Sequence, residues 1–145
     1  MSRLTPDERG AYAHFQAIPT RWADNDVYGH VNNSVYYFYF DTVVNQWLVE
    51  AGILDVGKSD TIGLVVETQC GFFAPISFPQ MVHAGLRIAR IGSSSVTYEI
   101  GLFADDKTET AARGHFVHVY VDEKTRRPVK ISDKMREKLG ELEVS

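Results

Sequence analysis

The sequence is poor in cysteine, with one residue, Cys70, in 145. A single thiol cannot form an intramolecular disulfide, and residues 1–15 contain no continuous apolar stretch of the signal-peptide type. We therefore expect a protein of a reducing, cytoplasmic compartment. Cys70 is expected to be a small buried residue and not a nucleophile, because the sequence indicates no histidine partner for it.

Long apolar runs and blocks of like charge are also missing. The most apolar region, 35–51, is interrupted by Asp41, Asn45 and Glu50, whereas a membrane-spanning helix needs ~20 nearly uncharged residues. The 15 lysine and arginine residues against 19 aspartate and glutamate residues give a net charge of -4, with no block of five like charges. We expect neither a membrane segment nor a nucleic-acid partner.

What is present fits one domain, residues 1–145, of the α+β class. Apolar residues on most sides predict a helix over 34–51, capped by Asn33 and buried on nearly all sides. Short breaks between the apolar runs favour an antiparallel meander. A helical turn at Thr5–Glu8 and a last helix after Ser132 complete the pattern. Strands are predicted at 14–22, 64–73, 80–91, 94–104 and 109–122. The prediction is a long central helix wrapped by an antiparallel sheet of about five strands.

The densest chemistry lies in the loop 21–33, RWADNDVYGHVNN, which leads into the N-terminus of the long helix. The first backbone N–H groups of a helix lack internal acceptors, and the helix dipole favours negative charge there. This helix end is therefore suited to stabilising an oxyanion. Asp26 lies seven residues before Asn33, close enough through a glycine-containing loop to face the same site. A carboxylate beside an oxyanion site is the minimum equipment for acyl hydrolysis.

Residues 24–36, DNDVYGHVNNSVY, resemble the motif of hotdog-fold acyl-CoA thioesterases of the 4-hydroxybenzoyl-CoA thioesterase-like group. The order of elements is similar to the hotdog fold over residues 13–125, and the turns at 72–75 and 90–95 resemble that family too. The resemblance implies cofactor-free hydrolysis of an acyl-CoA to a carboxylic acid and free CoA. It also implies a homodimer or homotetramer that pairs through the strand 64–73, with the substrate tunnel at the interface.

The resemblance also implies roles for single residues. Asp26 matches the catalytic aspartate, acting as general base or as nucleophile, and the backbone N–H of Asn33 would polarise the thioester carbonyl. His30 would orient or assist the chemistry, and Asn32 would hold the loop. The residues expected to contact substrate are Asn32, Tyr36 and, at the coenzyme A end, Arg90, Ser94 and Ser95.

Two other functions stay open at this point. One is a non-catalytic acyl-CoA-binding module, although a pure binder has no need of a carboxylate facing a thioester carbonyl. The other is an enoyl-CoA hydratase or dehydratase, since fold does not fix chemistry. No metal site is expected, because His115 and His118, three apart in a strand, would project to opposite faces. The chain length of the acyl group, and whether it is alkyl or aryl, stay open as well.

Overall fold

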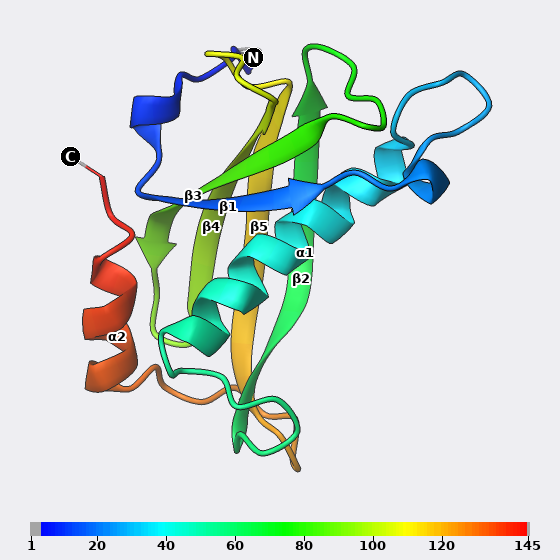
Figure 1. The fold of residues 1–145 in the computed structure, drawn as a ribbon. Coiled ribbons are helices and arrows are strands. Elements are labelled where there is room, and N and C mark those ends of the chain that lie inside the picture. The colour runs from blue at the N-terminus through cyan, green and yellow to red at the C-terminus, as the bar shows by residue number, and fades with distance from the viewer. Residues whose placement is uncertain (1–3, 145) are drawn as a thin grey trace.

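One long helix lies across a five-stranded antiparallel sheet in the computed structural model, which describes residues 4–144 (Figure 1). The strand order is β1-β3-β4-β5-β2, so β1 and β2 form the two edges. This is the architecture that the sequence predicts. In chain order, the elements are η1 (Arg9–Ala11), β1 (His14–Pro19), η2 (Trp22–Asp24), α1 (Asn33–Glu50), β2 (Thr61–Phe72), β3 (Met81–Ile91), β4 (Ser95–Ala104), β5 (Ala112–Asp122) and α2 (Asp133–Gly140).

The core lies between α1 and the face of the sheet that α1 covers. Alternation along β4 follows the two-residue period of a strand, and its side chains on the helix face are fully buried. The helix is buried on one face only, which corrects the expectation of burial on nearly all sides. Phe38 is 64% exposed because the sheet covers a single side of the helix. The buried helix residues are Tyr36, Tyr39, Phe40, Val43, Val44, Trp47 and Leu48. No helix within residues 4–144 is long and apolar enough to cross a membrane.

Several sequence predictions about the elements are wrong in detail: β1 ends at Pro19 and not at 22, β2 begins at Thr61 and not at 64, and β5 begins at Ala112 and not at 109. Asn32, not Asn33, is the N-cap of α1, because its side-chain oxygen accepts a hydrogen bond from the Ser34 N–H at 3.0 Å. The turn expected at Thr5–Glu8 is absent from the described chain, and the short helix η1 follows it instead. The Asp7 N–H donates to the Thr110 hydroxyl, so this segment pairs with a distant part of the chain instead of closing a local turn.

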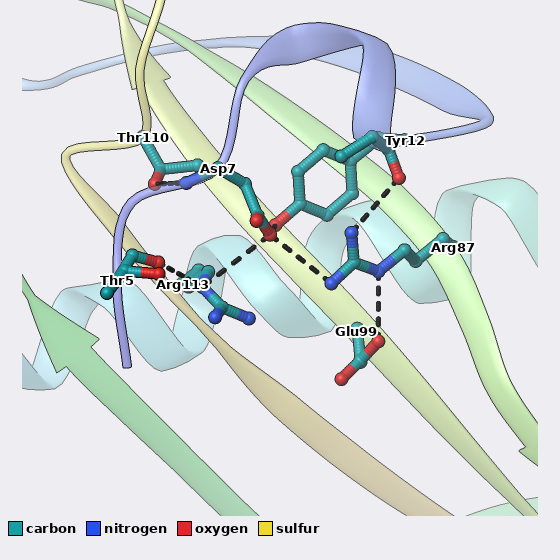
Figure 2. A network of polar contacts seen from close by, with 8 residues as sticks. Thr5, Asp7, Tyr12, Arg87, Glu99, Thr110 and Arg113 are labelled. Atoms are coloured by element: carbon teal, nitrogen blue, oxygen red, sulfur yellow. Dashed lines mark hydrogen bonds and ion pairs between the residues drawn. The ribbon is translucent and has the colours of Figure 1, made fainter. Parts of the chain in front are cut away.

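The segment before β1 is anchored on the face of the sheet opposite to α1 by a polar network (Figure 2). The Asp7 carboxylate lies 3.2 Å from Arg87 on β3 and 3.5 Å from Arg113 on β5, and it accepts a hydrogen bond from the Tyr12 hydroxyl. Arg87 also pairs with Glu99 at 2.9 Å. These charges are partly buried, so they are less screened than pairs in open solvent. The network fixes the N-terminal segment across three strands.

Candidate active site

The loop between β1 and α1 is held from inside by Asp24, whose side chain is 1% exposed. Its carboxylate accepts hydrogen bonds from the backbone and guanidinium of Arg21 and from the Tyr39 hydroxyl. Burial alone would raise the pKa of Asp24, but the bonds from Arg21 and Tyr39 outweigh it and hold the pKa below its ordinary value. Asp24 therefore fixes the loop and is committed to structural contacts.

Asp26 lies in a tight turn that presents its carboxylate at the loop surface. The Asp26 N–H donates to the His30 carbonyl at 2.8 Å, and the Gly29 N–H donates back to the Asp26 carbonyl at 3.1 Å. One carboxylate oxygen accepts a hydrogen bond from the Tyr28 N–H at 2.9 Å. Gly29 has a φ of +83°, which favours glycine at this position. The turn fixes the position of a half-buried carboxylate.

The segment between β2 and β3 supports the loop from the other side. The Val31 N–H donates to the Ile76 carbonyl at 2.7 Å, and the Ser77 hydroxyl donates to the Gly29 carbonyl at 3.0 Å. Sequence reasoning did not identify these supporting contacts. The only local signal is the proline-containing break at 74–79, which indicates a turn but not what the turn contacts.

An open cavity of about 650 Å³ lies at this end of α1, where the loop meets the end of β2. The structure brings five of the predicted site residues to it: Asp26, His30, Asn32, Asn33 and Tyr36. The other residues in its wall come from the same loop, from the end of β2 and from the segment that follows β2: Tyr28, Val31, Phe72, Phe73, Ala74 and Pro75. The wall combines apolar side chains with a few polar groups, as in many small-molecule sites.

The N-terminus of α1 supplies a backbone donor to the cavity. The Ser34 N–H is taken by the Asn32 side chain, and the Val35 N–H is taken by the Asn32 carbonyl. The described residues offer no acceptor to the Asn33 N–H. This donor lies at the positive end of the helix dipole, so it can stabilise an oxygen that becomes negatively charged.

Two aromatic rings form the apolar side of the cavity. Tyr36 is 3% exposed, and its ring meets the Phe72 ring edge to face at 4.9 Å between centroids. Burial raises the pKa of Tyr36, which keeps its hydroxyl protonated. His30 lies exposed in the cavity wall. The pairing of Tyr36 with Phe72 joins α1 to β2, a contact between elements that the sequence alone does not reveal.

Arg90, Ser94 and Ser95 do not line this cavity. The loop of Asp26 adjoins the Met81 end of β3, whereas these three residues lie at the turn between β3 and β4, at the other end of both strands. The C-terminal segment packs on this turn, because Arg136 donates to the Gly92 carbonyl at 2.9 Å. Within one chain, the structure therefore does not join them to the other predicted site residues.

The remaining histidines and the cysteine lie elsewhere. His115 faces outward with Glu67 at 2.7 Å, and His118 is buried on the opposite face, as the strand period predicts. Among residues 4–144, no group of three or more histidine, cysteine or acidic residues is arranged to hold a metal ion. Burial raises the pKa of the half-buried Cys70 to about 12, so its thiol is protonated and a poor nucleophile.

Comparisons with known proteins find solved structures with a similar fold. The PA5185 protein of Pseudomonas aeruginosa strain PAO1 is 50% identical, with a TM-score of 0.94 over 97% of this chain and 99% of that chain. The gentisyl-coenzyme A thioesterase BH1999 is 21% identical, with a TM-score of 0.78 over 87% of this chain and 99% of that one. A 1,4-dihydroxy-2-naphthoyl-CoA thioesterase from Synechocystis is 16% identical, with a TM-score of 0.78 over 87% of this chain and 94% of that one.

The similarity also extends to a curated sequence and to a family model. The YsmA protein of Bacillus subtilis (strain 168) is 23% identical over 129 residues, which cover 89% of this chain and 86% of that protein. The model of the thioesterase-like superfamily matches residues 20–139, a range that includes the Asp26 loop, α1 and the strands β2 to β5. The chain therefore belongs to the thioesterase-like superfamily, and its fold is the hotdog fold.

Proposed function

We propose that the protein hydrolyses acyl-CoA thioesters to a carboxylic acid and free coenzyme A. The observation that carries this proposal is that Asp26 and Asn33, the first residue of α1, line the same cavity. A proton acceptor or nucleophile beside an oxyanion donor is what acyl transfer to water requires. Two relatives of the fold are named as CoA thioesterases, which supports this substrate class.

In the proposed reaction the thioester carbonyl oxygen accepts a hydrogen bond from the Asn33 N–H. As base, Asp26 removes a proton from water while the water oxygen attacks the carbonyl carbon. As nucleophile, its carboxylate forms an anhydride that water then cleaves. In either case the C–S bond breaks, the CoA sulfur leaves with a proton, and the acyl group gains one water oxygen. His30, in the same wall, assists by orienting the reacting groups.

The aromatic walls fit an acyl group with apolar character. Tyr36 and Phe72 present an apolar surface beside the Asp26 carboxylate, where the acyl part of a thioester would lie. Asn32 acts by holding the loop, because its side-chain oxygen accepts hydrogen bonds from the Ser34 N–H and hydroxyl at 3.0 and 2.7 Å. Tyr36 contributes to the wall of the same cavity, where it would contact the substrate.

Free-thiol release from a panel of acyl- and aryl-CoA esters tests the proposed function directly. We expect release above the buffer rate for at least one ester, because the site holds both catalytic elements. The panel runs from short to long alkyl chains and includes benzoyl and hydroxybenzoyl esters. No release from any ester, together with tight acyl-CoA binding, would assign the chain to the binding modules instead. Water addition to an enoyl-CoA without thiol release would indicate a hydratase.

We propose further that two copies of the chain pair through β2. This edge strand spans Thr61–Phe72 and exposes apolar side chains, with Val66 58% exposed. A long edge with an open row of backbone groups and apolar side chains is a template for pairing with another strand.

Antiparallel pairing about a two-fold axis would set the Thr61 end of one β2 beside the Phe72 end of the other. The β3–β4 turn lies at the Thr61 end, because Leu64 pairs with Val119 and Val119 pairs with Ser95. The second copy would thus bring its Arg90–Ser95 turn toward the Asp26 cavity.

Placing a charge on the β2 edge tests this pairing. We expect the native chain to have at least twice the monomer mass by light scattering and Val66→Lys to shift toward the monomer. The reason is that a two-fold axis through β2 brings two lysines close together. Val56→Lys is the matched control, since Val56 is 74% exposed in the loop before β2. A monomeric native chain, or equal masses for the native chain and Val66→Lys, would contradict pairing through β2.

A further inference from the structure

A second cavity, of about 340 Å³, lies at the C-terminal end of α1, away from the Asp26 loop. Its wall comes from the last turns of α1, the loop that leads from α1 into β2, the start of β2, Tyr120 of β5, and the segment from 130 into α2; Figure 1 shows where these elements lie. None of the residues assigned to the thioesterase reaction lies in its wall. Its volume is within the range of small-molecule sites.

One side of this cavity is almost purely aliphatic. Leu48, Ile131 and Met135 are nearly fully buried, and Ile53 and Leu54 from the loop after α1 are half-buried beside them. Tyr120 is the sole aromatic residue in the wall formed by the described residues. A flat aromatic ligand such as a nucleobase would find few rings to stack on, whereas an alkyl chain fits aliphatic side chains.

The deepest polar groups beside the cavity are already satisfied by one another. The Tyr120 hydroxyl lies 2.8 Å from the Tyr98 hydroxyl and 3.2 Å from Nδ1 of His118. Burial lowers the pKa of His118 to about 4, so its ring is neutral near pH 7. The interior side of the cavity therefore holds no charge that a ligand would have to neutralise, and an uncharged tail can lie against it.

The solvent side of the cavity is basic. Lys130, Lys134 and Lys138 all contribute to its wall, and the last two lie one turn apart on α2. The opposing charges are few: Asp60 is in the same wall, and Lys138 is 3.6 Å from Glu141. Within residues 4–144, Lys130 and Lys134 form no ion pair, whereas Lys138 does. An aliphatic interior beneath a basic rim is the complement of an anionic amphiphile.

We infer that this cavity binds a carboxylate with an alkyl chain, such as a medium- or long-chain fatty acid. The chain lies against Leu48, Leu54 and Met135, and the carboxylate lies between Lys130 and Lys134. Within one chain this cavity shares no wall residue with the Asp26 cavity, and carboxylate binding in it does not depend on thioester hydrolysis.

Calorimetric titration of the native chain with decanoate, below the concentration at which decanoate forms micelles, tests the inference. We expect saturable binding of one decanoate per chain, no detectable binding of acetate, and weaker binding of decyltrimethylammonium, which has the same tail and the opposite charge. Raising the salt concentration should weaken decanoate binding, because the lysines are exposed. Non-saturable uptake, or equal binding of the anion and the cation, would overturn the inference.

A matched pair of charge reversals locates the site. Lys130→Glu combined with Lys134→Glu should weaken decanoate binding by about tenfold or more, since two exposed attractions become repulsions. Lys107→Glu combined with Lys124→Glu makes the same change in net charge on exposed lysines outside this cavity and should leave binding unchanged. Equal binding by both double variants would place decanoate elsewhere and overturn the inference. The experiment measures decanoate binding and not thiol release. Its result can therefore be interpreted even if the protein does not hydrolyse thioesters.

Discussion

Replacing Asp26 with asparagine is expected to lower kcat for thioester hydrolysis by roughly 10²–10⁴-fold. The amide has nearly the same shape as the carboxylate, and its oxygen can still accept the hydrogen bond from the Tyr28 N–H. The turn around Gly29 is held by backbone contacts and should persist. What is lost is the negative charge that removes a proton from water or attacks the carbonyl carbon. Steady-state thiol release with the best ester of the panel, together with the melting temperature, provides the measurement.

The neighbouring Asp24 provides the contrast. Asp24→Asn loses the carboxylate that binds Arg21 through three donors and leaves a buried polar site with weaker partners. We expect this variant to lower the melting temperature, whereas Asp26→Asn should leave it nearly unchanged. A native kcat in a folded Asp26→Asn variant would remove Asp26 from the chemistry. A large drop in the melting temperature of Asp26→Asn would show that its role is structural.

The sheet was predictable because its pattern is local. Along β4, every second residue from Val96 to Leu102 is apolar, and the structure buries each of these side chains under α1. The helix is different, because apolar residues surround its axis and periodicity cannot tell which of them a neighbour covers. The sheet covers the face of Phe40 and leaves Phe38 exposed. Burial on that side depends on what else packs there, which a single sequence does not contain.

The helix cap was ambiguous for a related reason. Two adjacent asparagines precede the apolar run, and either is an acceptable N-cap. The structure selects Asn32 because its N–H donates to the Asp24 carbonyl at 2.9 Å, which holds its backbone extended just before the helix. The choice is thus made by a contact eight residues away. Such contacts become visible only when the loop has its three-dimensional form.

The candidate site also has one part that the sequence predicts and another part that depends on the fold. Asp26, His30 and Asn33 lie in one stretch of chain, and a local motif was enough to bring them together. Phe72 enters the cavity from the far end of β2, and its meeting with Tyr36 depends on how α1 crosses the sheet. Arg90 was grouped with the site through family resemblance, but strand length places it at the other end of β3. In the proposed dimer, the second copy of the chain would bring its Arg90 toward the cavity.

His118 makes the stability of the fold dependent on pH. Its ring is 2% exposed among the rings of Tyr98, Phe116 and Tyr120, and burial lowers its pKa to about 4. In the unfolded chain a histidine has a pKa of about 6.5, so the unfolded state takes up a proton first as the pH falls. The free energy of unfolding therefore has its full value above pH 6.5, and it falls as the pH decreases from 6.5 to 4. The difference of about 2.5 pKa units corresponds to roughly 3 kcal/mol.

His118→Leu isolates this effect, because leucine fills a similar volume and cannot be protonated. We expect the free energy of unfolding of the native chain to fall by roughly 3 kcal/mol more than that of His118→Leu between pH 7 and 4. The tyrosines facing the ring do not titrate in this range, since burial raises the pKa of both Tyr98 and Tyr120. All other histidines and carboxylates are common to both chains, so their contributions cancel in the comparison. Urea unfolding at one protein concentration gives the two curves, and parallel curves would mean that His118 is accessible to protons in the folded state.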